Sequence, residues 1–430
     1  MFTLTDAKIG VVGLGYVGLP LACLFSKKYP VHGFDLNKNR IKDLENHTDK
    51  SEEVSPELLL DAFNNGLHVS DKISDIKDCN IYIIAVPTPV DEDNNPDLNP
   101  IIKVTKSIGE ILKDGDTVIY ESTVYPGLTE EVCVPILESQ SSLEFNKEFY
   151  VGYSPERINP GDKEHPIEKI KKITSGSTPE VAKRIDDLYS SVLLNGTHLA
   201  PSIKVAEAAK IIENSQRDVN IAFVNEIAKL FGAMGIDTLS VLEAAGTKWN
   251  FQPFKPGLVG GHCISVDPYY LIQRGDDIGV DLRVMKAARS VNSSMGSYVA
   301  NRVLSRLKEK KNKLTGSYNI LLIGFTFKED CKDLRNTQVY DIYRSLQSKG
   351  NNASIYDPVC DREKAKQEYG IDVLDSFKEI EKRKPWDAII YCVNHSNFKT
   401  IDLKSLCDEN TVVFDVKGGI EDRSLVTERL

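Results

Sequence analysis

The chain has 430 residues, of which 27% are charged, and its formal net charge is −10. This length exceeds that of one typical hydrophobic core and predicts two or three domains. The negative charge and the absence of a basic block argue against a nucleic-acid partner. Apolar runs of about ten residues are too short to cross a bilayer, and MFTLTDAKIG lacks the pattern of a signal peptide, so we expect a cytoplasmic protein with no membrane partner.

Residues 8–35 predict a strand, a glycine turn, a helix and a second strand. KIGVVG is a short apolar run, GLGYVGLPLACLFSK continues at helical spacing, and PVHGFD ends at Asp35. Gly13, Gly15 and Gly18 have the spacing of a dinucleotide-binding loop, in which glycines allow a tight turn, the approach of a pyrophosphate and the packing of helix on strand. An acidic residue about 20 positions on binds the adenosine ribose and repels a 2′-phosphate, so Asp35 favours NAD over NADP.

Further strands are predicted at residues 80–89 and 116–127, and they would end at the sheet edge where doubly wound folds bind ligands. Residues 201–235 then predict one long helix, with Ser202 as its cap and the glycines at 232 and 235 as its stop. A helix of this length between two α/β parts is a natural surface for a homodimer.

The stretch GLVGGHCISVDPYY, residues 257–270, places Cys263 among loop glycines. None of the eight cysteines forms a C-x-x-C pair, so the sequence predicts neither a disulfide framework nor a zinc ribbon, and we expect no metal. Glycine pairs let a backbone approach a ligand closely. Cys263 is therefore either a structural thiol of the loop or a nucleophile.

The part that begins near residue 318 repeats the pattern of the first part. NILLIG corresponds to KIGVVG, DAIIYCVNH to NIYIIAVPTP, and SIYD to HGFD, so that Asp357 closes a strand as Asp35 does. The third loop glycine is missing, so we expect a ligand other than a second NAD. The predicted fold is α/β, with two Rossmann-like doubly wound domains joined by a long central helix and a helical dimerisation region. Its domains are predicted at residues 1–200, 201–312 and 313–430.

Seven separated stretches carry a resemblance to known proteins: GLGYVGLPLA, AVPTP, ESTVYPG, YSPERINPG, EAAKIIENSQRDVNIAFVNE, PGLVGGHCISVDPYYL and GFTFKEDCKDLRNT. In these motifs and their order, the chain resembles the UDP-glucose/GDP-mannose dehydrogenase family from residue 8 to residue 425. The resemblance implies an enzyme that oxidises the primary alcohol of a nucleotide sugar to a carboxylate with two NAD per turnover. It also implies that the first domain binds NAD and the last binds the UDP-sugar.

Such a reaction requires one nucleophilic cysteine. Loss of the first hydride leaves an aldehyde, whose sp² carbon cannot give up a second hydride until a thiolate has added to it. The resulting thiohemiacetal is oxidised to a thioester, which water hydrolyses. The resemblance puts Cys263 in this role. Two rival hypotheses are a two-electron dehydrogenase of the hydroxyacid type, which has no need of Cys263, and a non-catalytic nucleotide-sugar sensor.

The resemblance assigns further catalytic roles to five residues. Lys210 and Asn214, at positions i and i+4 of one helix, would stabilise an oxyanion, although their spacing alone favours a solvated face. Asp267 would act as a base for the thiol or for the hydrolytic water. Glu156 would position water or act as a base, and Thr123 would hold a water or the nicotinamide side of the site.

The resemblance also implies two sets of binding residues. Those for NAD are Gly13, Gly15, Tyr16, Val17, Gly18, Asp35, Arg40, Thr88, Thr123 and Arg335. Those for the UDP-sugar are Glu156, Arg157, Lys210, Asn214, Phe254, Gly260 and Lys328. Arg335 would reach the NAD phosphates, because guanidinium groups pair well with phosphate oxygens.

The sequence of the cysteine loop differs from the one that is usual in UDP-glucose enzymes. VGGHCISVDPYY replaces FGGSCFPKD, with His262 before the thiol and Val266 where a lysine is usual. This wording is similar to dehydrogenases of N-acetylated sugars, and it favours UDP-GlcNAc or UDP-GalNAc in capsule and O-antigen synthesis, with UDP-ManNAc or UDP-glucose as alternatives. His262 would either favour the thiolate as an imidazolium or simply pack. Pro160 replaces a second family glutamate, so Glu156 and Asp267 would have to activate the water.

Overall fold

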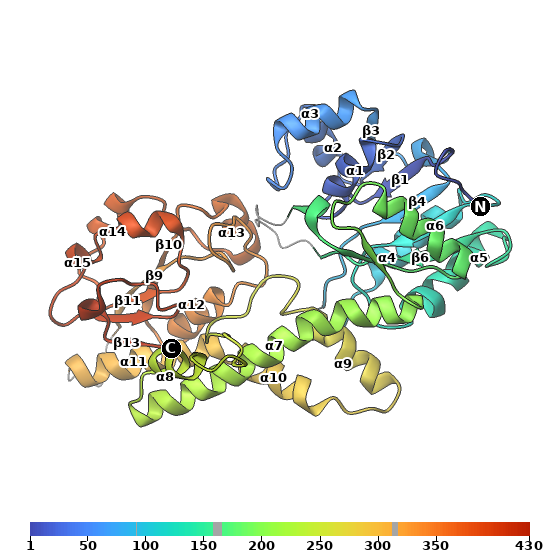
Figure 1. Cartoon of the computed structure of the whole chain (residues 1–430). Helices are drawn as coiled ribbons and strands as arrows, with labels where there is room; N and C mark the ends of the chain where they lie inside the picture. The colour runs from blue at the N-terminus through green and yellow to red at the C-terminus, as the bar shows by residue number, and fades with distance from the viewer. Residues whose placement is uncertain (92, 158–165, 312–316) are drawn as a thin grey trace. The chain divides into compact units, whose positions relative to one another are not determined.

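The structure is a computed structural model that describes residues 1–91, 93–157, 166–311 and 317–430. It divides into two compact units. Unit 1 comprises residues 1–213 and 269–280, and unit 2 comprises residues 214–268 and 281–430. Each unit has its own parallel sheet (Figure 1).

The main sheet of unit 1 has the order β3-β2-β1-β4-β5-β6, and all its strand pairs are parallel. Its strands are β1 (Ile9–Val12), β2 (Val31–Phe34), β3 (Leu67–Ser70), β4 (Ile81–Ile84), β5 (Thr117–Tyr120) and β6 (Tyr150–Tyr153). Ile9 is in register with both Val31 and Ile81, so the strand order reverses on either side of β1. This is the doubly wound order of dinucleotide-binding folds, which bind ligands where the order reverses.

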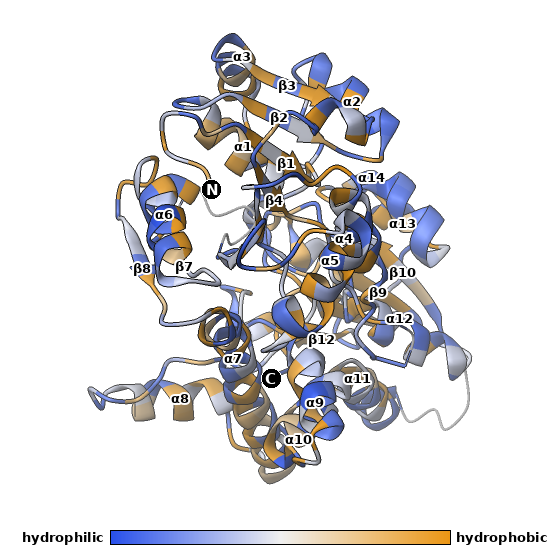
Figure 2. Ribbon diagram, turned by 90° about the vertical axis from the view of Figure 1, so that its right-hand side faces the viewer, coloured by the Kyte–Doolittle hydropathy of each residue, from blue (hydrophilic) through white to orange (hydrophobic). Residues whose placement is uncertain are grey.

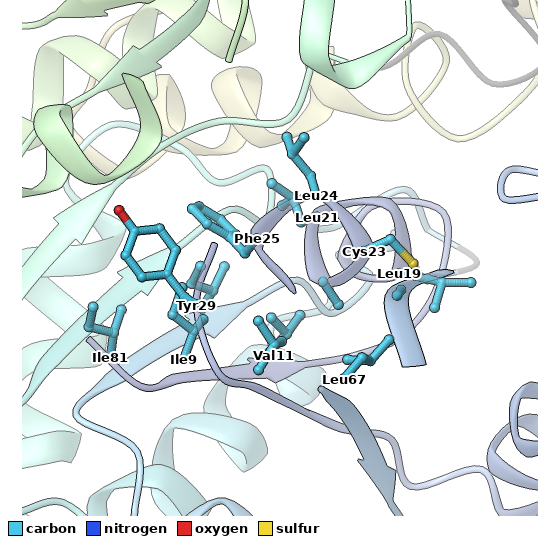
Figure 3. Close-up of a cluster of buried hydrophobic side chains, with 14 of the residues drawn as sticks. Ile9, Val11, Leu19, Leu21, Cys23, Leu24, Phe25, Tyr29, Leu67 and Ile81 are labelled. Carbon is cyan, nitrogen blue, oxygen red and sulfur yellow. The ribbon is translucent and has the colours of Figure 1, made fainter. Parts of the chain in front are cut away.

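Helices pack on this sheet because parallel strands are apolar on both faces. The α-helices in the first 200 residues of unit 1 are α1 (Gly18–Ser26), α2 (Lys38–Glu45), α3 (Pro56–Asn64), α4 (Asn99–Gly109), α5 (Val134–Ser141) and α6 (Pro179–Ser190). Leu21 and Phe25 of α1 lie over Ile9 and Val11 of β1 in a buried cluster (Figure 3). A short pair of parallel strands, β7 (Lys172–Thr174) and β8 (Thr197–Leu199), completes unit 1.

Helix α7 (Ile203–Met234) has 32 residues and passes from unit 1 into unit 2. The prediction of one long helix is confirmed, and the Ser202 hydroxyl accepts a hydrogen bond from the amide of Val205, as expected of its cap. The predicted stop at Gly232 is wrong, because Gly232 lies inside the helix. A Cβ there would come within 3.1 Å of the Tyr298 hydroxyl, so a side chain at this position would require the tyrosine to shift slightly. Gly235 follows the helix with a φ of +72°, the usual conformation of a glycine that ends one.

The sheet of unit 2 has the order β10-β9-β11-β12-β13 and is also parallel. Its strands are β9 (Asn319–Ile323), β10 (Asn352–Tyr356), β11 (Ala388–Tyr391), β12 (Val412–Asp415) and β13 (Glu428–Arg429). Its helices are α8 (Thr238–Gly246), α10 (Arg283–Ser293), α11 (Met295–Lys311), α12 (Val339–Ser348), α13 (Arg362–Tyr369), α14 (Phe377–Lys382) and α15 (Leu403–Leu406), whereas α9 (Asp267–Asp277) lies mostly in unit 1. Strands β1 and β4 carry hydrophobic residues, whereas α2 and α13 are mostly hydrophilic (Figure 2).

The predicted α/β class, with two Rossmann-like parallel sheets and a long central helix, is confirmed. In the part of the chain that the structure describes, no helix is long and apolar enough to span a bilayer.

Candidate active site

The glycine loop of unit 1 follows β1 and has the geometry that a bound pyrophosphate needs. Gly13 has a φ of +91°, and a Cβ there would lie 2.7 Å from the carbonyl oxygen of Ala85. A Cβ on Gly18 would lie 1.8 Å from the carbonyl oxygen of Gly13, so helix and strand meet too closely for any side chain. A Cβ on Gly15 would meet nothing within 4 Å. Gly15 therefore leaves its backbone open to a ligand, as a dinucleotide loop requires.

Asp35 follows β2 and supports the same loop. Its carboxylate oxygens accept hydrogen bonds from the amides of Leu14 (2.9 Å) and Asn37 (2.8 Å). Arg40 on α2 donates from Nε to the carbonyl oxygen of Leu14 at 2.8 Å and pairs with the Asp49 carboxylate at 2.6 Å. Arg40 therefore holds the backbone of the glycine loop in place through Leu14. Its contact with the cofactor stays a prediction. Of the neighbouring predicted residues, Val17 packs against the core and Tyr16 is half-buried.

Three more predicted site residues follow adjacent strands of this sheet. Thr88 comes after β4, Thr123 after β5 and Glu156 after β6, and each is half-buried. Because the carboxyl ends of parallel strands share one edge, the three residues lie along the edge that also carries Gly13 and Asp35. The structure thus places Gly13 and Glu156, which are 143 positions apart in the sequence, on the same edge of the unit 1 sheet.

A buried ionic cluster that sequence reasoning missed lies beneath this edge. Lys172 donates from Nζ to the Glu121 carboxylate at 2.6 Å and to the carbonyl oxygen of Pro155 at 3.0 Å. The Tyr189 hydroxyl donates to the other Glu121 oxygen at 2.5 Å. Burial raises the pKa of Glu121 to about 7, against the lowering effect of Lys172. The cluster fixes the carbonyl directly before Glu156, and its only sequence signal was a glutamate at the end of an apolar strand.

Helix α7 carries Lys210 and Asn214, which are only 8% and 9% exposed. The interpretation that their spacing alone favoured, a solvent-exposed helix face, is therefore wrong. Glu207, one turn before Lys210, is fully buried, and its carboxylate accepts from the amides of Gly127 (2.6 Å) and Thr129 (3.0 Å). Burial raises the pKa of Glu207 to about 7. Glu207, a second residue that sequence reasoning missed, thus fastens the loop of Thr123 to the helix of Lys210.

Unit 2 contains the cysteine loop and links it to α7. The carbonyl oxygen of Cys263 accepts from the amides of Val266 (3.0 Å) and Asp267 (2.8 Å), so the turn after the cysteine leads directly into α9. The Asp267 side chain is 3% exposed and accepts from the Asn214 amide at 2.6 Å. The predicted base and one of the two predicted oxyanion-stabilising residues are therefore in direct contact. His262 Nε2 lies 3.9 Å from the Cys263 sulfur, at the limit of a hydrogen bond to sulfur.

The remaining predicted binding residues divide between the two units. In unit 1, Arg157 pairs with the Glu213 carboxylate at 3.0 Å and is exposed. In unit 2, the guanidinium of Arg335 donates from Nε to the Asp333 carboxylate at 2.9 and 3.0 Å. Phe254, Gly260 and Lys328 of unit 2 are half-buried. Pro160 lies outside the described residues. Among the residues described, no cluster of three or more His, Cys, Asp or Glu side chains could hold a metal.

Comparison with known proteins identifies the family of the chain. Three models of the UDP-glucose/GDP-mannose dehydrogenase family match in chain order: the NAD binding domain at residues 7–193, the central domain at 204–294 and the UDP binding domain at 321–422. The chain is 51% identical over 415 residues to UDP-N-acetyl-D-glucosamine 6-dehydrogenase of Pseudomonas aeruginosa, covering 96% of this chain and 97% of that protein. It is 49% identical over 420 residues to the Salmonella typhi protein of the same name, with 97% of each covered.

A solved structure agrees with these matches. The UDP-D-ManNAc dehydrogenase of Pyrococcus horikoshii superposes with a TM-score of 0.88 at 28% identity, and 98% of each chain is covered. The glycine loop with Asp35 has the geometry of a dinucleotide-binding loop, which agrees with the match to the NAD binding domain. The chain therefore belongs to the UDP-glucose/GDP-mannose dehydrogenase family and is an NAD-dependent UDP-sugar 6-dehydrogenase.

Proposed function

We propose that the protein oxidises the C6 hydroxymethyl group of UDP-N-acetylglucosamine or UDP-N-acetylgalactosamine to the uronic acid, in two steps, through a covalent intermediate on Cys263. One observation carries the proposal. The backbone of Cys263 begins the helix of Asp267, whose buried carboxylate accepts a hydrogen bond from Asn214. The cysteine is thus four residues from a buried carboxylate that is bonded to an amide, and a thiol, a carboxylate and an amide are the groups that thioester formation and hydrolysis require.

The choice of substrate rests on the relatives and on the cysteine loop. The two relatives at 51% and 49% identity are named for UDP-N-acetyl-D-glucosamine, whereas the superposed dehydrogenase of UDP-D-ManNAc is 28% identical. His262 and Val266 also depart from the UDP-glucose wording. UDP-N-acetylglucosamine is therefore our first candidate, ahead of UDP-GalNAc, UDP-ManNAc and UDP-glucose. The sequence of residues 248–263 resembles the subgroup that feeds capsule and O-antigen synthesis, which supports a role in supplying uronic acid for surface polysaccharides.

In the proposed mechanism, the glycine loop of Gly13, Gly15 and Gly18 would hold NAD, which would supply the hydride acceptor for each of the two oxidations. Lys210 and Asn214 donate hydrogen bonds to the C6 oxygen as it gains negative charge. The Cys263 thiolate adds to C6 of the aldehyde and forms a C–S bond, and the resulting thiohemiacetal loses a hydride to become a thioester. Asp267, with Glu156, takes a proton from water, which attacks the thioester. The C–S bond then breaks, and the carboxylate product and the free thiol result.

We further assign NAD binding to residues 1–200, the catalytic helix and cysteine to residues 201–312, and UDP-sugar binding to residues 313–430. The descriptions of the three matching family models support this division. Arg335 and Lys328 would supply positive charge to diphosphates from the last domain.

The test is the amount of NADH formed per mole of sugar nucleotide consumed, with UDP-GlcNAc, UDP-GalNAc, UDP-ManNAc and UDP-glucose assayed separately. We expect two NADH and one uronic acid from an N-acetylated sugar. One NADH per sugar, with an aldehyde as the product, would contradict the covalent mechanism. Turnover of UDP-glucose alone would contradict only the choice of substrate.

We also propose a homodimer that forms through α7. Five exposed apolar residues follow this helix at spacings of 7, 11, 7 and 4: Val205, Ile212, Phe223, Leu230 and Met234. At about 100° per residue they form one stripe. Lys210 and Asn214 lie on the opposite side of the helix. A second copy of the stripe would cover it, because a two-fold dimer pairs a surface patch with itself.

Phe223→Glu with Leu230→Glu is therefore expected to weaken the dimer on the order of 100-fold or more. The two side chains are 59% and 52% exposed in the single chain. Burial of such a side chain contributes about 1.5–3 kcal/mol, and in a two-fold interface each substitution removes that contribution from both subunits. Sedimentation velocity would measure the change. Leu60→Glu, at a 47% exposed leucine on α3, is the matched control and should sediment as the wild type does. A double variant that still sediments as the wild type would exclude this stripe as the interface.

A further inference from the structure

Gly261, two residues before Cys263, has both of its backbone groups bonded to one neighbouring loop of unit 2. Its amide donates to the carbonyl oxygen of Arg335 at 3.0 Å. Its carbonyl oxygen accepts from the side-chain amide of Asn336 at 2.9 Å, and also from the Ser265 hydroxyl. Consecutive residues of the second loop, Arg335 and Asn336, therefore fix the peptide groups on both sides of Gly261.

The two loops approach too closely for side chains at the contact. A Cβ on Gly260 would lie 2.8 Å from the carbonyl oxygen of Asn336, and one on Gly261 would lie 2.8 Å from the ring of Phe327. Asn336 itself has a φ of +52°, in the left-handed region that asparagine and glycine tolerate. Contact with this loop thus explains why residues 260 and 261 are glycines. It is a second explanation beside the expected close approach of a ligand.

The second loop, residues 325–337, is itself held firmly to the sheet. The amides of Phe325 and Thr326 both donate to the buried Asp357 carboxylate that closes β10, at 2.7 and 3.2 Å. The Thr337 hydroxyl closes the loop by donating to the carbonyl oxygen of Phe325 at 2.7 Å. Asp357 thus anchors the loop instead of binding a ribose as Asp35 is expected to do. Because this loop is fixed to the sheet, its hydrogen bonds to Gly261 also fix the position of Gly261.

We propose that Asn336 is a positioning residue for the Cys263 thiol. Its side-chain amide fixes the peptide group after Gly261, while the turn into α9 fixes the carbonyl of Cys263 on the other side. The thiol is used only in the oxidation of the aldehyde, so the loss of this hydrogen bond affects the second oxidation more than the first. This inference rests on the proposed covalent role of Cys263. Reacting groups misplaced by about 1 Å can lose as much as 100-fold in rate.

Asn336→Gly tests the proposal, because glycine accepts the positive φ and leaves the bond from the Gly261 amide to the Arg335 carbonyl possible. Asn336 is exposed, so the change leaves the core intact. We expect an about tenfold slower reaction of Cys263 with iodoacetamide, measured by mass spectrometry of its peptide. We also expect an about tenfold slower oxidation of the aldehyde to acid, with aldehyde trapped by an alkoxyamine. KM for NAD should stay within about twofold.

Asn146→Gly is the matched control, because Asn146 is exposed, has a φ of +62° and lies in unit 1 before β6. It should behave as the wild type in every assay. If Asn336→Gly folds poorly, Asn336→Asp keeps the shape and replaces the donor with a carboxylate that repels the Gly261 carbonyl. Wild-type alkylation and aldehyde oxidation in the folded variant would overturn the proposal.

The alkylation assay separates this proposal from the proposed function. If the wild type forms one NADH per sugar, the covalent mechanism fails, yet the ratio of the Cys263 alkylation rates still reports whether Asn336 positions the thiol. If the wild type forms two NADH and the ratio is one, only the role of Asn336 fails.

Discussion

Cys263→Ser is expected to lower the rate of uronic acid formation by at least about 1,000-fold. A serine hydroxyl is far less nucleophilic than a thiolate, and loss of a covalent nucleophile commonly has an effect of this size or larger. Oxidation of the alcohol to the aldehyde does not use the thiol, so a slow release of aldehyde with at most one NADH per sugar should remain. Stopped-flow recording of NADH, together with mass spectrometry of the products, would measure both rates.

Cys407→Ser is the matched control for this change. Cys407 is half-buried like Cys263 and lies after α15, in a part of unit 2 that holds none of the predicted site residues. The control should keep full activity. Acid formation at the wild-type rate by Cys263→Ser would contradict the covalent mechanism. Unchanged activity of Cys263→Ser, with one NADH per substrate, would instead favour a two-electron dehydrogenase of the hydroxyacid type. Stoichiometric binding of sugar nucleotide by the wild type, with no NADH at all, would instead indicate a sensor.

The fold could be predicted because its signals are local. The strand, glycine turn and second strand of residues 8–35 all follow from apolar runs and glycine spacing, and the repeat of that pattern near residue 318 predicted the second sheet. The end of α7 was less predictable. Gly232 and Gly235 have the same local signal, but only Gly235 has a positive φ, whereas Gly232 packs against Tyr298. A glycine inside a helix and a glycine that ends one are alike in sequence.

The pairing of side chains in the site could not be predicted, because the partners are far apart in sequence. Lys210 and Asn214 have the spacing of a solvated face, yet they are only 8% and 9% exposed. Asn214 meets Asp267, which is 53 positions away, and no local pattern indicates that contact.

Lys172→Met is expected to lower the free energy of unfolding of unit 1 by about 3–5 kcal/mol, the usual cost of removing one partner of a buried ion pair. Lys172 is 1% exposed, and its ammonium lies 2.6 Å from the Glu121 carboxylate. Without it, the carboxylate would stay buried with a hydrogen bond from the Tyr189 hydroxyl but with no ammonium beside it. Urea unfolding followed by hydrogen exchange of peptides from β5 and β6 would measure the loss within unit 1.

The pH dependence of this loss distinguishes an ion pair from simple packing. Burial already raises the pKa of Glu121 to about 7, and removal of Lys172 would raise it further. A carboxyl whose pKa is raised in the folded state stabilises the fold below its unfolded pKa of about 4.5, and this stability is lost as the pH rises toward the folded value. The deficit of Lys172→Met should therefore be small near pH 4.5 and largest above pH 7. Adding Glu121→Gln removes the buried charge and should restore most of the stability at high pH. A deficit that is equal at all pH values would mean that Lys172 stabilises unit 1 by packing and not by its charge.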